Sequence, residues 1–113
     1  MGASAARSWK GSAPVFAALG DETRLRLVAR LCESGPQSIV KLTEGSDVTR
    51  QAIAKHLRVL EGAGLVRSAR DGRESVWELE TRRLEDARRA LDAISKRWDD
   101  AIERLRAHVE KGD

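Results

Sequence analysis

The chain has 113 residues, with 21 Lys and Arg against 18 Asp and Glu, so its formal net charge is only +3. This length suits one compact domain with a small core. No apolar run approaches the ~20 residues that a membrane-spanning helix needs, and residues 1–12 lack the apolar stretch of a secretory signal. Cys32 is the only cysteine, which excludes an intrachain disulfide and gives no sign of an oxidising compartment. We therefore expect a cytoplasmic location and no membrane partner.

The N-terminal part of the chain predicts a loose arm followed by two helices. Residues 1–12 are rich in Gly, Ala and Ser, so we expect them to be disordered or loosely docked, with Trp9 as the candidate docking residue. A short helix is expected after Pro14, because a first turn offers no partner for the missing N–H. Asp21 is placed to cap the next helix. The apolar spacing of that helix predicts that Cys32 is a buried thiol.

Two more helices are predicted, each beginning at a hydroxyl-bearing cap. Ser38 caps a helix over 39–44, and Thr49 caps one that ends near Gly62 and Gly64. In this last helix apolar residues form a buried stripe, and Arg, Gln, Ala and Lys occupy the opposite face. The stripe consists of Ile53, Leu57 and Leu60, and the opposite face of Arg50, Gln51, Ala54, Lys55 and Arg58.

The segment LVRSARDGRESVWELE that follows predicts a β-hairpin. Asp71-Gly72 between two β-prone runs is a strong signal for a type I′ turn, because both central residues need positive φ angles. A two-residue loop there would place Arg70 opposite Arg73. Like charges directly opposite each other disfavour folding slightly, and a polyanion would relieve the repulsion.

The last helix is predicted from about Thr81 to Glu110. Apolar residues recur at heptad positions a and d over about 3.5 heptads. At 1.5 Å per residue this helix would be roughly 45 Å long, too long for so small a core to cover. The pattern therefore predicts a dimerisation helix. Its seam consists of Leu84, Ala87, Leu91, Ile94, Trp98, Ala101, Leu105 and His108, widened by Ile102 and Val109.

Three helices followed by a hairpin is the element order of a winged helix-turn-helix, so the expected fold class is mainly α with a small β-hairpin wing. The chain then divides into the arm (1–12), a DNA-binding domain (13–80) and a dimerisation helix (81–113). Exposed Arg and Gln on the fourth helix suit guanine and adenine edges in a major groove. The N–H groups at its start suit a phosphate. Arg70 and Arg73 can reach an adjacent backbone or minor groove.

Three stretches of the chain are also familiar: FAALGDETRLRLVARL (16–31), VTRQAIAKHLRVLEGAGLVRSARDGRESVWEL (48–79) and the long helix after them. They resemble the arsenical-resistance-repressor (ArsR) family of bacterial winged-helix transcription regulators. The resemblance spans roughly residues 14–110, and the middle stretch is its most specific part. It implies a repressor that binds double-stranded DNA as a homodimer, joined by its first and last helices, and that releases the DNA when an effector binds. The two-fold symmetry of such a dimer predicts a palindromic operator.

Site residues follow from the resemblance together with the charge pattern. The predicted DNA contacts are Thr49, Arg50, Gln51, Ala54, Lys55, His56 and Arg58 on the fourth helix and Arg70 and Arg73 on the wing. The predicted dimer contacts are Val15, Phe16, Leu84, Leu91, Ile94, Trp98, Ile102 and Leu105.

The chain departs from the metal sensors of that family. Those sensors carry a Cys-x-Cys motif on the third helix, where residues 39–42 here read IVKL. A second metal site of the family needs several Asp, His and Glu ligands on the last helix, where this chain has only His108, Glu110 and the more distant Asp99 and Asp100. The chain therefore resembles a metal-independent branch that needs no cofactor and answers to an unidentified small molecule or protein.

Other interpretations stay open on sequence grounds. The basic side of the fourth helix also fits an ordinary solvated face, and His56 fits a histidine at the edge of the core. Cys32 and His108 leave room for a metal- or thiol-responsive sensor of the same fold, and the heptad helix alone suits a dimeric protein-binding scaffold. No Ser/His/Asp, Cys/His or phosphate-loop arrangement is present, so an enzyme is not expected.

Overall fold

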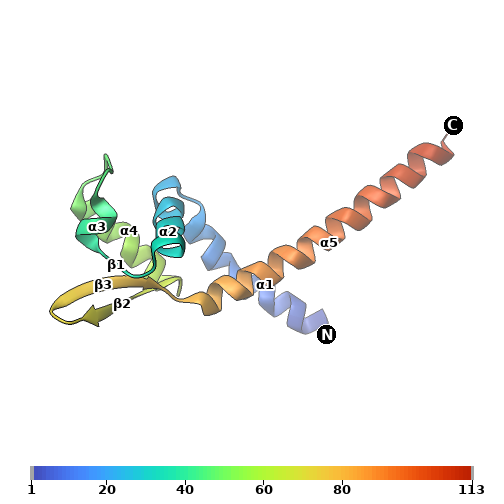
Figure 1. Ribbon diagram of the computed structural model, residues 1–113. Helices are drawn as coiled ribbons and strands as arrows, with labels where there is room; N and C mark the ends of the chain where they lie inside the picture. Colours follow the sequence, from blue (N-terminus) through green and yellow to red (C-terminus); the bar gives the residue numbers. More distant parts are fainter. Residues whose placement is uncertain (1, 113) are drawn as a thin grey trace.

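The computed structural model describes residues 2–112, with side chains described from residue 11 onward. This part of the chain forms five helices and three strands in the order α1, α2, β1, α3, α4, β2, β3 and α5 (Figure 1). Their bounds are α1 Gly2–Leu19, α2 Glu22–Ser34, β1 Gln37–Ser38, α3 Ile39–Thr43, α4 Arg50–Gly62, β2 Val66–Asp71, β3 Glu74–Leu79 and α5 Thr81–Lys111. The predicted fold class, mainly α with a β-hairpin after the helix-turn-helix pair α3 and α4, is confirmed.

Helix α1 begins much earlier than the sequence predicts. It starts at Gly2 and carries Pro14 in its interior, where we expected an irregular arm over 1–12 and a short helix after the proline. Alanines are frequent in this stretch and are the strongest helix formers, and α1 packs along α5, which lends it tertiary support. The expected docking of Trp9 concerns a side chain outside the described residues.

The three predicted helix caps are confirmed. Each cap side chain accepts a hydrogen bond from the backbone N–H three residues on, at 3.0 Å for Asp21, 3.3 Å for Ser38 and 3.1 Å for Thr49. A cap of this kind satisfies one of the N–H groups that a helix start leaves without an intrahelical partner. Local chemistry therefore fixes where α2, α3 and α4 begin.

The core lies between α1, α2 and α4, and the start of the wing and the first turns of α5 complete it. On α4 the predicted stripe of Ile53, Leu57 and Leu60 is at most 1% exposed, which confirms the phase of that helix. On α2 the prediction of a buried Cys32 is wrong. The buried residues of this helix are Leu27, Val28 and Leu31, whereas Cys32 is exposed. The pair Leu27 and Leu31, one turn apart, defines the apolar face and turns the thiol to solvent.

The wing is an antiparallel sheet in the order β1-β3-β2. Strand β1 is only two polar residues long and was not predicted. The hairpin register also differs from expectation, because Arg70 faces Ser75 and Asp71 faces Glu74. The turn is therefore Gly72-Arg73, with Gly72 at φ +64° in the first central position, as in a type II′ turn. This register separates the two arginines that the predicted register places opposite each other, and it sets the carboxylates of Asp71 and Glu74 opposite each other instead.

Helix α5 confirms the predicted long C-terminal helix and gives the molecule its extent of 68 Å. Its first turns pack against α1, and Ala87 and Ala90 are the buried residues of the helix. Its distal part runs away from the remaining elements to the C-terminus (Figure 1). None of the described helices combines the length and the apolarity that a membrane span requires.

Candidate nucleic-acid interface

The outward side of α4 is a cationic surface that no described acidic group neutralises. Because the buried stripe fixes the rotation of the helix, Arg50, Gln51, Lys55 and Arg58 are all exposed. Within residues 11–112 these four side chains make no ion pair or hydrogen bond, and the first turn of α4 holds no acidic residue. The predicted polar face is thus brought together on one helix, free to meet an external partner. Of the other predicted contacts, Thr49 is the exposed cap and Ala54 is half-buried.

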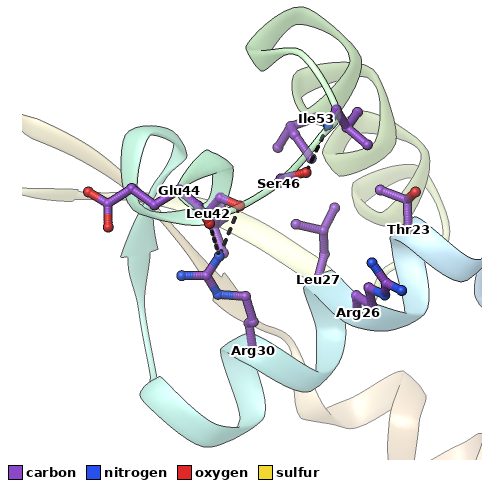
Figure 2. A pocket seen from close by; sticks show the side chains of 10 residues that line it. Thr23, Arg26, Leu27, Arg30, Leu42, Glu44, Ser46 and Ile53 are labelled. Carbon is purple, nitrogen blue, oxygen red and sulfur yellow. Dashed lines mark hydrogen bonds between the residues drawn. The ribbon is translucent and has the colours of Figure 1, made fainter.

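Arg30 of α2 holds the turn that leads from α3 into α4. Its Nη1 donates to the carbonyl oxygens of Leu42 at 3.1 Å and Glu44 at 3.2 Å, as Figure 2 shows. Leu27 and Ile53 border a cavity of about 170 Å³ beneath this turn. The guanidinium replaces the hydrogen bonds that the end of the short α3 helix lacks. The orientation of α4 therefore depends on a residue of α2 that the sequence pattern did not single out.

A second contact with α2 determines how His56 is presented. Arg24 donates through Nε to the carbonyl oxygen of Ala18 at 2.6 Å, and its Nη1 lies 3.2 Å from Nδ1 of His56. Since a guanidinium can only donate, Nδ1 is the acceptor and the neutral imidazole carries its proton on Nε2. The ring is half-buried at the edge of α4. Nδ1 of His56 is thus engaged by Arg24 at the edge of the core, and its Nε2–H is available to donate a hydrogen bond.

Asp21 lies beside this pair, with a carboxylate oxygen 3.8 Å from Nδ1 of His56. The hydrogen bond from the backbone N–H of Arg24 lowers the pKa of Asp21 below its ordinary value, and the charge of Arg24 acts in the same direction. Partial burial opposes these effects. The carboxylate is therefore stabilised in its charged form at the start of α2.

The wing offers a smaller cationic surface at its tip. Arg70 and Arg73 are exposed there, and Nη1 of Arg70 donates to the carbonyl oxygen of Arg73 at 3.4 Å. Arg67 is different, because it pairs with Glu78 at 2.7 Å and with Glu80 at 3.3 Å. These carboxylates raise the pKa of Arg67. The charges of Arg70 and Arg73 are therefore available to an external anion, whereas the charge of Arg67 is paired within the hairpin.

The predicted dimer contacts fall into two groups. Leu91, Ile94, Trp98 and Leu105 are 48–67% exposed along α5, and Ile102 is half-buried. Phe16 and Leu84 are half-buried against the core of the protomer. The prediction that Val15 is a dimer contact is wrong, because Val15 is only 1% exposed and lies within the core of the protomer. Val109, which is 61% exposed, extends the apolar seam toward the C-terminus.

The two residues on which the hypothesis of a metal- or thiol-responsive sensor rests belong to different helices. Cys32 lies in α2 and His108 in the distal part of α5. In the part of the chain with described side chains, no three His, Cys, Asp or Glu residues gather closely enough to hold a metal ion.

A family of helix-turn-helix domains matches residues 19–69. The uncharacterised HTH-type transcriptional regulator YuzN of Bacillus subtilis is 46% identical over an alignment of 68 positions that covers 55% of this chain and 74% of that protein. The arsenical resistance operon repressor of the same species is 34% identical over 64 residues, 57% of this chain and 61% of the repressor.

Among solved structures, an ArsR-like transcriptional regulator from Rhodococcus sp. RHA1 superposes with a TM-score of 0.72 at 37% identity. The match covers 88% of this chain and 92% of that one, so it includes the terminal helices as well as the central domain. A structure described as a homodimeric winged helix-turn-helix domain from Mycobacterium bovis shares the fold at 21% identity. With this fold, this basic helix face and these relatives, the chain belongs to the ArsR family of helix-turn-helix transcriptional regulators.

Proposed function

We propose that this protein is a sequence-specific transcriptional repressor that binds double-stranded DNA as a homodimer. The observation that carries the proposal is the outward side of α4. It combines side chains able to pair with guanine and adenine edges, a helix start rich in N–H donors, and positive charge that the described residues do not neutralise. The wing tip adds Arg70 and Arg73 for a neighbouring phosphate or minor groove.

The homodimer is supported by the apolar seam of α5. Leu91, Ile94, Trp98 and Leu105 together leave a continuous apolar stripe in solvent on one side of a helix that projects from the domain. Contiguous apolar surface of this kind marks an interaction site. A two-fold symmetric pair would present two α4 helices to successive major grooves about 34–36 Å apart, so we expect a palindromic operator.

The signal that releases the DNA is proposed to be something other than a metal ion. Residues 39–42 place no sulfur on α3, and Cys32 is a single exposed thiol. A structural zinc site commonly takes four nitrogen or sulfur ligands, and two His and one Cys per chain do not provide them. We infer a small-molecule or protein effector, no cofactor, no catalytic activity, and action in the cytoplasm where the DNA is.

The test is a matched set of three alanine variants, titrated by fluorescence anisotropy on a duplex selected from a randomised library. Arg50→Ala and Gln51→Ala remove candidate base contacts, and each should weaken binding by about 1–3 kcal/mol and relax specificity at one base position. Arg89→Ala is the control. Arg89 is 68% exposed, pairs with Asp86 and lies on the side of α5 opposite the seam, so its loss removes the same charge elsewhere.

Equal losses for Arg50→Ala and Arg89→Ala would mean that only the total charge matters, which contradicts base reading by α4. Parent-like binding by both Arg50→Ala and Gln51→Ala would show that DNA meets another surface.

A further inference from the structure

An open hollow of about 590 Å³ lies between the first turn of α4 and the start of α3. We call it the α3–α4 hollow. It is lined by Ile39 of α3 and by Thr49, Arg50, Gln51 and Ala54 around the start of α4. Its exposed lining is mostly apolar, although three of these five residues are polar. Ile39, the methyl of Ala54 and the carbon atoms of their neighbours therefore form an apolar recess.

The position of this recess is unusual, because it interrupts the polar side of α4. Arg50 and Gln51 border it, and Lys55 and Arg58 continue the basic side along the helix. The hydroxyl of Thr49 accepts the N–H of Ala52 at 3.1 Å, so it is occupied by the helix cap. A surface that bound only phosphates would have no use for a recess lined by carbon.

The edges of base pairs offer one apolar group in the major groove, the C5-methyl of thymine. The N-terminal residues of a recognition helix are those that contact base edges, and the recess is formed at that end of α4. A methyl group in the recess would exchange its contacts with water for contacts with carbon atoms. Arg50 and Gln51 would remain able to form hydrogen bonds with the edges of adjacent bases.

We infer that the α3–α4 hollow reads thymine, by accepting the C5-methyl group of one thymine in each half-site of the operator. Ile39 and Ala54 supply the contacts. The inference rests on the proposed function, since it requires α4 to enter a major groove. It adds a specificity-determining residue, Ile39, that lies outside the recognition helix.

The chemical test removes the methyl group and leaves the Watson–Crick edge unchanged. Two randomised duplex libraries, one made with thymidine and one with deoxyuridine, are put through selection on the full-length protein. Each thymine of the duplex enriched from the first library is then replaced singly by uracil. One thymine in each half-site should lose about fourfold in affinity, the value expected for one buried methyl group. The other positions should change less than twofold.

Protein variants connect that thymine with the recess. Ile39→Ala should bring the affinity ratio between the thymine and uracil duplexes close to one, and Ile39→Val should retain most of it. Val40→Ala is the control, because Val40 is the next residue of α3 and half exposed but does not line the hollow. It should keep the fourfold ratio, and circular dichroism should show the same helix content for all three variants.

The outcomes separate this inference from the proposed function. A selected duplex that tolerates uracil at every position would overturn the thymine recess and leave DNA binding intact. A fourfold ratio that persists in Ile39→Ala would overturn the assignment to this hollow. Failure of both libraries to yield any enriched sequence would contradict the proposed function, and the inference would fall with it.

Discussion

Single residues of α2 connect α4 to the rest of the molecule. Arg24 binds the end of α1 and Nδ1 of His56, and Arg30 binds the turn before α4. Neither contact follows from a sequence pattern, because Arg24 and His56 are 32 positions apart. The caps at Asp21, Ser38 and Thr49 were predictable, since each depends on a partner three residues away.

The two nitrogens of His56 have different roles, and two substitutions distinguish them. His56→Ala should lower the free energy of unfolding by about 1 kcal/mol, because Arg24 loses a hydrogen-bond acceptor, and it should also weaken DNA binding. His56→Asn places an amide oxygen near the position of Nδ1 and provides no group at Nε2. It should therefore recover most of the stability and none of the DNA affinity. Urea unfolding and anisotropy measure the two effects, and a variant that recovers both would exclude a DNA contact by Nε2.

Asp21 should make stability depend on pH in the acid range. Its pKa is lower in the folded protein than in the unfolded chain, so the unfolded state binds more protons as the pH falls. The stabilisation is fully present above the ordinary pKa and is lost as the pH falls through the folded pKa. In urea unfolding between pH 7 and 3, Asp21→Asn, which keeps a cap acceptor, should show a shallower fall than the parent. Asp100→Asn, which removes an exposed carboxylate from α5, is the control, and a parent-like slope for Asp21→Asn would contradict the assignment.

At the scale of elements, the helices were easier to predict than the strands. The buried stripe of α4 has a clear helical period, and its residues were predicted correctly. On α2 the apolar residues fit two helical faces that are offset by one residue, so their spacing alone does not decide which face is buried. Strand β1 has two polar residues and no alternation, so it forms only because β3 is beside it. The hairpin was predicted, but its register was not: the Asp-Gly signal placed Arg70 opposite Arg73, whereas the observed register places Arg67 opposite Glu78, with which it forms an ion pair.

The turn of the wing predicts opposite effects for two glycine substitutions. Gly72 has φ +64°, so Gly72→Ala should destabilise the protein by about 1 kcal/mol through strain in the left-handed region. Gly62 ends α4 without a positive φ, and no atom lies within 4 Å of an added Cβ. Gly62→Ala should therefore stabilise by up to about 1 kcal/mol. Urea unfolding compares the two, and a Gly72→Ala protein as stable as the parent would contradict the positive φ of Gly72 in the turn.

At the scale of the whole molecule, the account depends on a second copy of the chain. The heptad pattern predicted α5 from sequence, and the structure shows the seam in solvent from Leu91 onward, whereas Ala87 is buried within the protomer. What the pattern did not reveal is that α1 extends from Gly2 and packs along the start of α5, which places Val15 inside the protomer. Burial of that kind depends on how two helices pack, and no periodicity within either helix encodes it.

Ile94 should be essential for the pairing of two chains. Ile94→Glu puts a charge into the middle of the apolar seam, and burying an unpaired carboxylate costs several kcal/mol. Sedimentation equilibrium should show the parent near twice the 12.5 kDa of one chain and the variant near 12.5 kDa. Lys96→Glu introduces the same side chain on the opposite side of α5 and should remain dimeric. A dimeric Ile94→Glu protein would place the interface off the seam.

The central claim is that this dimer recognises a DNA sequence and does more than attract a polyanion. The most direct measurement is anisotropy of the parent protein on the genomic fragment most enriched by selection, against a shuffled duplex of equal composition, in a series of salt concentrations. We expect the selected fragment to bind at least about a thousandfold more tightly than the shuffled one, with log K falling linearly with log salt for both. Equal, weak affinity for the two duplexes at every salt concentration would contradict the claim.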